Sequence, residues 1–106
     1  MATVYVVEYA QLGREVYGGP GTLIQAPLEP ALATQTVAIG SSSTQCANTF
    51  NEQTTLVLVS TDAICSIAFG TNPNAKNTNH RMAANAAQFF SVPPGKQFKI
   101  AVITNS

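Results

Sequence analysis

The chain has 106 residues, no net charge, and charged side chains at only 9% of its positions, against roughly 25% in an average domain. This length predicts a single domain over 1–106, since most domains contain about 100–150 residues. The five lysines and arginines form no run, which argues against nucleic-acid binding, because phosphate contacts require a basic surface. No apolar stretch approaches the roughly 18 residues of a membrane span, and the N-terminus lacks the pattern of a signal peptide. We therefore expect a protein made in the cytoplasm that binds neither nucleic acid nor membrane.

The low charge also predicts association. Weakly charged surfaces repel one another little, and a domain of this size buries only about two thirds of its unfolded surface. We therefore expect a homo-oligomer, either a dimer or a trimer, with much of its surface covered by partners or by copies of itself.

The N-terminal third of the chain predicts one strand followed by an arm. Residues 3–9 are β-branched or aromatic almost throughout, which favours a strand. Glycines and prolines then recur, so we interpret 10–34 as an irregular, arm-like segment with a short strand at 22–25. Pro27 and Pro30 exclude a central strand there, because proline cannot donate a hydrogen bond to a sheet.

The middle of the chain predicts four strands separated by polar turns. Polar and apolar residues alternate in the strands expected over 35–39 and 64–69, as is typical of half-buried strands. The strand expected over 55–61 is apolar almost throughout, as expected for a central strand. The strand expected over 43–50 offers Cys46 and Phe50 as core residues.

The C-terminal third predicts a long polar loop over 70–79 and two further strands, over 86–92 and 97–104. Prolines and a glycine at 93–95 form a tight turn between these strands. Residues 82–88 are the only weak candidate for a helix.

Short strands spaced roughly ten residues apart predict an all-β fold, an antiparallel β-sandwich or small barrel of seven or eight strands. The core is expected to be apolar and to come from most of these strands. Its predicted members are Val37, Ile39, Leu56, Leu58, Ile67, Phe69, Phe89, Phe98, Ile100 and Val102.

The two cysteines, Cys46 and Cys65, are too few and too far apart for a zinc site or a redox pair. Both lie among apolar or small residues. Two buried, reduced thiols are therefore favoured over a disulfide, which stays open as the alternative.

Candidates for catalysis are few. His80 is the only histidine and lies beside a polar loop, and a triad of Ser60, His80 and Asp62 has no motif to position it. The segment Gly18–Gly21 lacks the lysine and helix of a phosphate loop. Asp62 is interpreted as a turn residue whose side chain accepts backbone N–H groups. The other carboxylates are scattered singly, at Glu8, Glu15, Glu29 and Glu52, and are interpreted as solvated residues at strand edges or in turns. We thus predict no catalytic, cofactor or metal residues and no enzyme.

A carbohydrate-binding module is the main alternative from another class. Tyr5 and Tyr9 are four residues apart on one predicted strand, so they share a face that could form an aromatic platform. Tyr17 is the third tyrosine, and there is no tryptophan. A core or interface face is the favoured use of this pair.

The C-terminal half contains four segments in this order: 56–73, then Met-Ala-Ala-Asn at 82–85, then Phe-x-Val-Pro-Pro-Gly at 90–95, then Ile-Ala-Val-Ile at 100–103. In these segments and in their order, the chain resembles the small head proteins of tailed bacteriophages. The N-terminal half is similar only in size and β character.

The resemblance implies a capsid decoration or cement protein. Some such proteins have a jelly-roll-like β-sandwich and clamp neighbouring major capsid subunits from outside the shell. We therefore expect the major capsid protein as partner and the virion surface as location. The resemblance supplies no binding residues; the segment up to Pro30 and the loop Gly70–Asn79 are the predicted contact surfaces because both are rich in turn-forming residues and poor in core pattern. A tail, fibre or connector component is the alternative within the virion.

Overall fold

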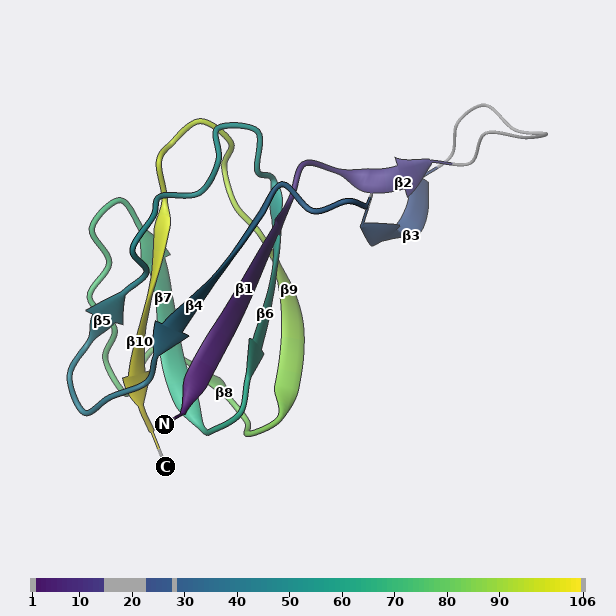
Figure 1. The fold of residues 1–106 in the computed structure, drawn as a ribbon. Helices are drawn as coiled ribbons and strands as arrows, with labels where there is room; N and C mark the ends of the chain where they lie inside the picture. The colour runs from purple at the N-terminus through teal and green to yellow at the C-terminus, as the bar shows by residue number, and fades with distance from the viewer. Residues whose placement is uncertain (1, 15–22, 28, 106) are drawn as a thin grey trace.

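The computed structural model describes residues 2–14, 23–27 and 29–105, in which all regular structure is β and no helix occurs (Figure 1). Strands form where β-branched and aromatic residues cluster, and Gly, Pro and Asn separate them. The strands are β1 Thr3–Tyr9, β2 Leu12–Arg14, β3 Leu23–Pro27, β4 Ala33–Ala38, β5 Thr44–Gln45, β6 Leu56–Thr61, β7 Cys65–Gly70, β8 His80–Met82, β9 Ala86–Ser91 and β10 Lys99–Thr104. Residues 82–88, the weak helix candidate, instead fall in β8, a turn and β9, so that expectation was wrong.

Eight of the strands form two four-stranded antiparallel sheets (Figure 1). The first, called here the β1 sheet, has the order β4-β1-β6-β9, and the second, the β10 sheet, has the order β5-β10-β7-β8. All pairings within them are antiparallel. The predicted all-β antiparallel sandwich is thereby confirmed.

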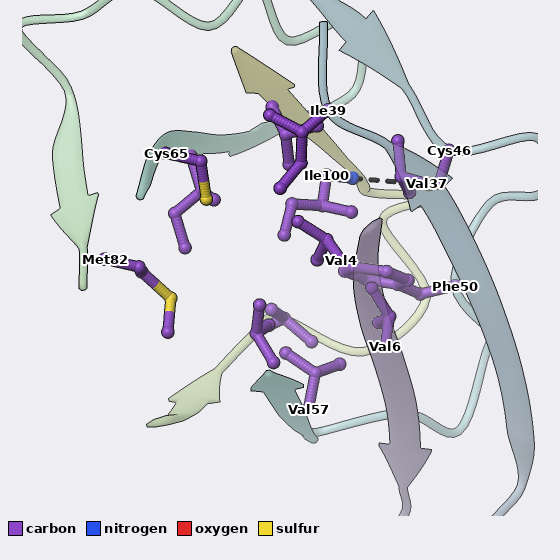
Figure 2. Packing of buried hydrophobic residues seen from close by; sticks show 14 residues of the cluster. Val4, Val6, Val37, Ile39, Cys46, Phe50, Val57, Cys65, Met82 and Ile100 are labelled. Atoms are coloured by element: carbon purple, nitrogen blue, oxygen red, sulfur yellow. Dashed lines mark hydrogen bonds between the residues drawn. The ribbon is translucent and has the colours of Figure 1, made fainter. Parts of the chain in front are cut away.

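The core fills the space between the two sheets (Figure 2). Val4 and Val6 of β1 and Ile100 and Val102 of β10 are fully buried in it. Phe69, Phe90 and Phe98 are partly buried and pack against this cluster. The remaining core residues are Val37, Ile39, Cys46, Phe50, Val57, Val59, Cys65, Ile67, Met82 and Val92.

Three predicted core residues lie outside this core. Leu56 and Leu58 of β6 are only partly buried, and Phe89 of β9 is 49% exposed. Their neighbours Val57 and Val59 are fully buried instead. Because side chains alternate between the two faces of a strand, a register error of one residue exchanges the two sets. Leu56, Leu58 and Phe89 therefore project from the outer face of the β1 sheet.

The outer face of the β10 sheet is covered by the segment 71–79. Ser66 and Ala101 alternate with core residues, so they point outward, yet both are fully buried. Asn105 Nδ2 donates hydrogen bonds to Ser66 Oγ and to the Asn77 carbonyl, which ties the segment to this face. Within the segment Ala75 is itself buried. The protein thus covers one of its two outer faces with its own chain.

Strands β2 and β3 form a separate antiparallel hairpin, which projects from the sandwich (Figure 1). The hairpin lies within 10–34, the segment expected to be irregular. The radius of gyration of 14.6 Å exceeds the roughly 13 Å of a compact domain of this size. At the base of the arm, Tyr9 Oη donates a hydrogen bond to Glu29 Oε2 at 2.9 Å, and Leu32 N donates to the Glu8 carbonyl at 2.7 Å.

Candidate protein-interaction surface

The residues considered for a catalytic triad do not form one in the structure. His80 Nε2 lies 2.8 Å from Gln88 Oε1, and its ring packs edge-on against Phe90 at 5.4 Å. Asp62 Oδ1 accepts a hydrogen bond from Thr3 N at 2.7 Å. Ser60 points outward from β6, in the other sheet from His80. Asp62 therefore accepts a backbone N–H as predicted, although the donor lies on β1 and not in its own turn.

Glu8 is buried, so its interpretation as a solvated strand-edge residue was wrong. Its side chain is 2% exposed, and its Oε1 accepts hydrogen bonds from Asn51 N at 2.7 Å and from Thr54 Oγ1 at 2.8 Å. Val4, Val6 and Glu8 alternate on one face of β1, and this spacing could have indicated burial. Glu8 therefore fixes the turn before β6 against β1.

The other candidate residues are separated from one another. Glu29 and Glu52 are exposed, at the base of the arm and in the 51–54 turn. Glu15, Tyr17 and Gly18–Gly21 lie outside the described residues. Within the described residues, no three metal-ligating side chains come together. The same part of the chain contains no helix that could span a membrane.

Cys46 and Cys65 are free and buried, as the favoured interpretation predicted. Cys46 Sγ lies 3.2 Å from the Asn48 carbonyl, to which it donates, and 3.4 Å from Ile100 N, from which it accepts. Burial raises the pKa of both thiols, and at Cys46 the hydrogen bond from Ile100 N only partly opposes this effect. Both thiols act as small packing residues in the core.

The outer face of the β1 sheet carries no charge and consists of apolar and hydroxyl-bearing side chains. Glu8 is the only charged residue in the four strands of this sheet, and its side chain points inward. Alternation and register place Thr34, Thr36, Ala38, Thr3, Tyr5, Val7, Tyr9, Leu56, Leu58, Ser60, Ala87, Phe89 and Ser91 on the outer face. Exposed apolar faces of this kind mark interaction sites in soluble proteins.

Two aromatic side chains are the most exposed large apolar groups described. Tyr5 is 47% exposed and Phe89 is 49% exposed, and both lie on this outer face. Val7, Leu58 and Phe89 follow one another across neighbouring strands β1, β6 and β9. This row forms a continuous apolar stripe that ends at the edge of the sheet.

Tyr9 shares the outer face with Tyr5, as predicted, but is only 5% exposed. The Tyr9–Glu29 hydrogen bond lies at the base of the arm. It raises the pKa of the Tyr9 phenol, and burial and the Glu29 charge add to that effect. The two tyrosines therefore do not form the open aromatic platform of a carbohydrate site.

The loop Gly70–Asn79, a predicted contact surface, is held against its own sheet. Gln45 Nε2 donates to Asn72 Oδ1 at 2.8 Å and to the Pro73 carbonyl at 2.9 Å, and Ala75 N donates to Ser43 Oγ at 2.8 Å. Much of the loop is therefore structural. Its exposed side chains are those of Thr71, Asn72, Asn74, Lys76, Asn77, Thr78 and Asn79.

Comparison with protein-family models, with curated proteins and with solved structures finds no match to this chain.

Proposed function

We propose that this protein is a non-enzymatic structural component of a bacteriophage virion that binds the outside of the capsid and stabilises contacts between major capsid subunits. The observation that carries the proposal is the outer face of the β1 sheet, which has exposed apolar side chains and no charges from its strands. Such a face favours a permanent protein partner, because burial of apolar surface drives association.

The two outer faces of the sandwich differ in a way that supports this role. The β10 sheet is covered by 71–79, whereas no described segment covers Tyr5, Leu58 and Phe89 on the β1 sheet. The hairpin β2–β3 projects from the end of the β1 sheet at which β1 ends and β4 begins (Figure 1). A rigid sheet with a projecting arm can contact two neighbouring subunits at once.

Repetition on a shell makes weak individual contacts sufficient. Each copy binds with the modest affinity of a small interface, and copies held on one particle act together. The major capsid protein is the proposed partner and the virion surface the proposed location. A tail, fibre or connector component would use the same kind of surface at a lower copy number.

The first test is the copy number of this chain in purified virus particles, measured by quantitative mass spectrometry against the major shell protein. A ratio near that of the shell protein supports a decoration role. A handful of copies per particle would favour a tail or connector role, and absence from the particles would overturn the virion proposal.

The second test locates the capsid-binding face. Leu58→Lys places a charge in the apolar face, and Thr78→Lys places the same charge on the exposed loop of the other side. In co-sedimentation with capsids that lack this protein, we expect Leu58→Lys to weaken binding at least tenfold and Thr78→Lys to bind like wild type. Unchanged binding by Leu58→Lys would exclude this face as the contact.

A further inference from the structure

The β1 sheet has two edges, β4 and β9, and they differ in what they offer a partner. β9 carries no charge and no proline, and it pairs with β6 without a register shift over Ala86–Ser91. Natural edge strands are usually protected by charges, prolines, bulges or shortness. In the other sheet, the edge strands β5 and β8 have only two and three residues, and β8 carries His80 and Arg81. None of these protections is present in β9.

The backbone of β9 presents unused hydrogen-bonding groups at this edge. Val92 N donates to the Thr55 carbonyl at 3.0 Å, so the antiparallel ladder assigns the even-numbered residues of β9 to hydrogen-bonded pairs with β6. Ala87, Phe89 and Ser91 then direct their N–H and C=O groups away from the sheet. Among the described residues, β6 is the only strand that pairs with β9.

We propose that β9 pairs antiparallel with β9 of a second copy of this chain, joining two β1 sheets into one continuous eight-stranded sheet. The symmetric register that uses all three outward positions places Phe89 opposite Phe89 of the second copy, and Ala87 opposite Ser91. Each of these positions exchanges two backbone hydrogen bonds with its opposite residue. An antiparallel strand pair around a two-fold axis is self-complementary, so one surface serves both copies.

The side chains favour this register. Phe89 projects from the outer face and is 49% exposed, so the two rings meet across the axis as a cross-strand aromatic pair. Ala87 and Ser91 are small and leave room for the rings. No charge lies on β9, so two copies meet without like-charge repulsion.

The other edge lacks these side chains. β4 directs Thr34, Thr36 and Ala38 outward, which are small and mostly polar, and pairing there would bury little apolar surface. β9 therefore fits a second copy better than β4 does. The inference does not depend on the capsid proposal, because purified protein alone tests it.

The test is the mass in solution by light scattering after size-exclusion chromatography. Wild type is expected at twice the 11.1 kDa of one chain. Ala87→Pro removes one outward N–H while leaving the pairing with β6 intact. Phe89→Lys places two positive charges opposite each other across the two-fold axis of the dimer. Both variants are expected to weaken dimerisation at least tenfold, whereas Thr36→Lys on β4 stays dimeric. A monomeric wild type, or loss of the dimer in Thr36→Lys alone, would overturn the proposal.

Cysteine cross-linking tests the register without relying on the strength of the dimer. Opposite residues in hydrogen-bonded antiparallel pairs have Cα atoms about 5.5 Å apart, within reach of a disulfide. On oxidation, Phe89→Cys is expected to form a covalent dimer, and Ala87→Cys alone is not, because its counterpart is Ser91. The buried native thiols do not compete. Cross-linking of Ala87→Cys in preference to Phe89→Cys would contradict this register.

Discussion

Phe69 of β7 and Phe90 of β9 meet between the two sheets, with ring centroids 5.2 Å apart and ring planes inclined at 49°. Such tilted aromatic pairs are favourable beyond the area that they bury. Since neighbouring residues in a strand face opposite ways, the inward position of Phe90 places Phe89 on the outer face. This contact therefore determines which aromatic ring of β9 is available to a partner.

The first prediction concerns the role of Phe90 in the core. Phe90→Ala removes the ring that packs against Phe69 and His80, and we expect the free energy of unfolding to fall by about 2–4 kcal/mol. Chemical denaturation measures this loss. Ser91→Ala, on the exposed side of the same strand, serves as the control and should change stability by less than about 0.5 kcal/mol.

The second prediction tests the register of β6. Val57 is fully buried and Leu58 is half-buried on the outer face. We expect Val57→Ala to lower the free energy of unfolding by about 2 kcal/mol and Leu58→Ala by about 1 kcal/mol or less, although Leu58→Ala removes more atoms. Denaturation of the two variants side by side gives the order. The reverse order would place Leu58 in the core.

The sequence predicted the core face of a strand correctly where larger apolar residues alternate with small or polar ones. In 64–69 the alternating pattern placed Cys65, Ile67 and Phe69 on the core face, as the structure confirms. The Leu-Val-Leu-Val run of β6 and the Phe-Phe pair of β9 contain no alternation, so both registers satisfied the pattern. The structure selects one register through pairing with β1, where Glu8 and Val6 lie opposite Val57 and Val59. Such pairing is a long-range property that a local pattern does not contain.

The interaction surface was harder to predict than the fold. Abundant turn-forming residues indicated 70–79 as a contact loop, but hydrogen bonds to the backbone of the loop hold it against its own sheet. The uncharged face arises because four strands distant in sequence lie side by side. The low overall charge predicts association without indicating a surface, and only the strand order shows which face is free of charge.

The third prediction concerns the buried carboxylate of Glu8. Glu8→Ala leaves Asn51 N and Thr54 Oγ1 without their acceptor, so we expect a loss of about 2–3 kcal/mol in stability, since buried donors left without a hydrogen bond are costly. Hydrogen exchange at the Asn51 amide should also accelerate. Glu52→Ala, in the same turn but exposed, should change neither measurement, and unchanged exchange in Glu8→Ala would refute the anchoring role.

The fourth prediction concerns alkaline pH and the two thiols. Burial raises the pKa of Cys46 and Cys65 above that of a free thiol, so the unfolded thiols ionise first. Their stabilising effect is thus complete below about pH 8.5 and is lost as the pH rises. For each thiol, the free energy of unfolding falls by at most about 1.4 kcal/mol per pH unit. Denaturation between about pH 8 and 10 measures this decline. The Cys46→Ala/Cys65→Ala double variant should show a flatter profile, and an equally steep one would exclude the thiols as its cause.

The fifth prediction concerns the hydrogen bond at the base of the arm. Tyr9 Oη donates to Glu29 Oε2 at 2.9 Å, and this bond is the main cause of the raised pKa of Tyr9. Glu29→Gln removes the carboxylate charge and its strong acceptor, so the Tyr9 pKa should fall toward the ordinary tyrosine value of 10.0. Titration of the ultraviolet phenolate absorbance measures it, and Tyr9→Phe identifies which transition belongs to this residue. Because a raised pKa stabilises the fold only while the phenol keeps its proton, wild type should lose this contribution above about pH 10. A Tyr9 transition that does not move in Glu29→Gln would show that the arm is not anchored through this pair.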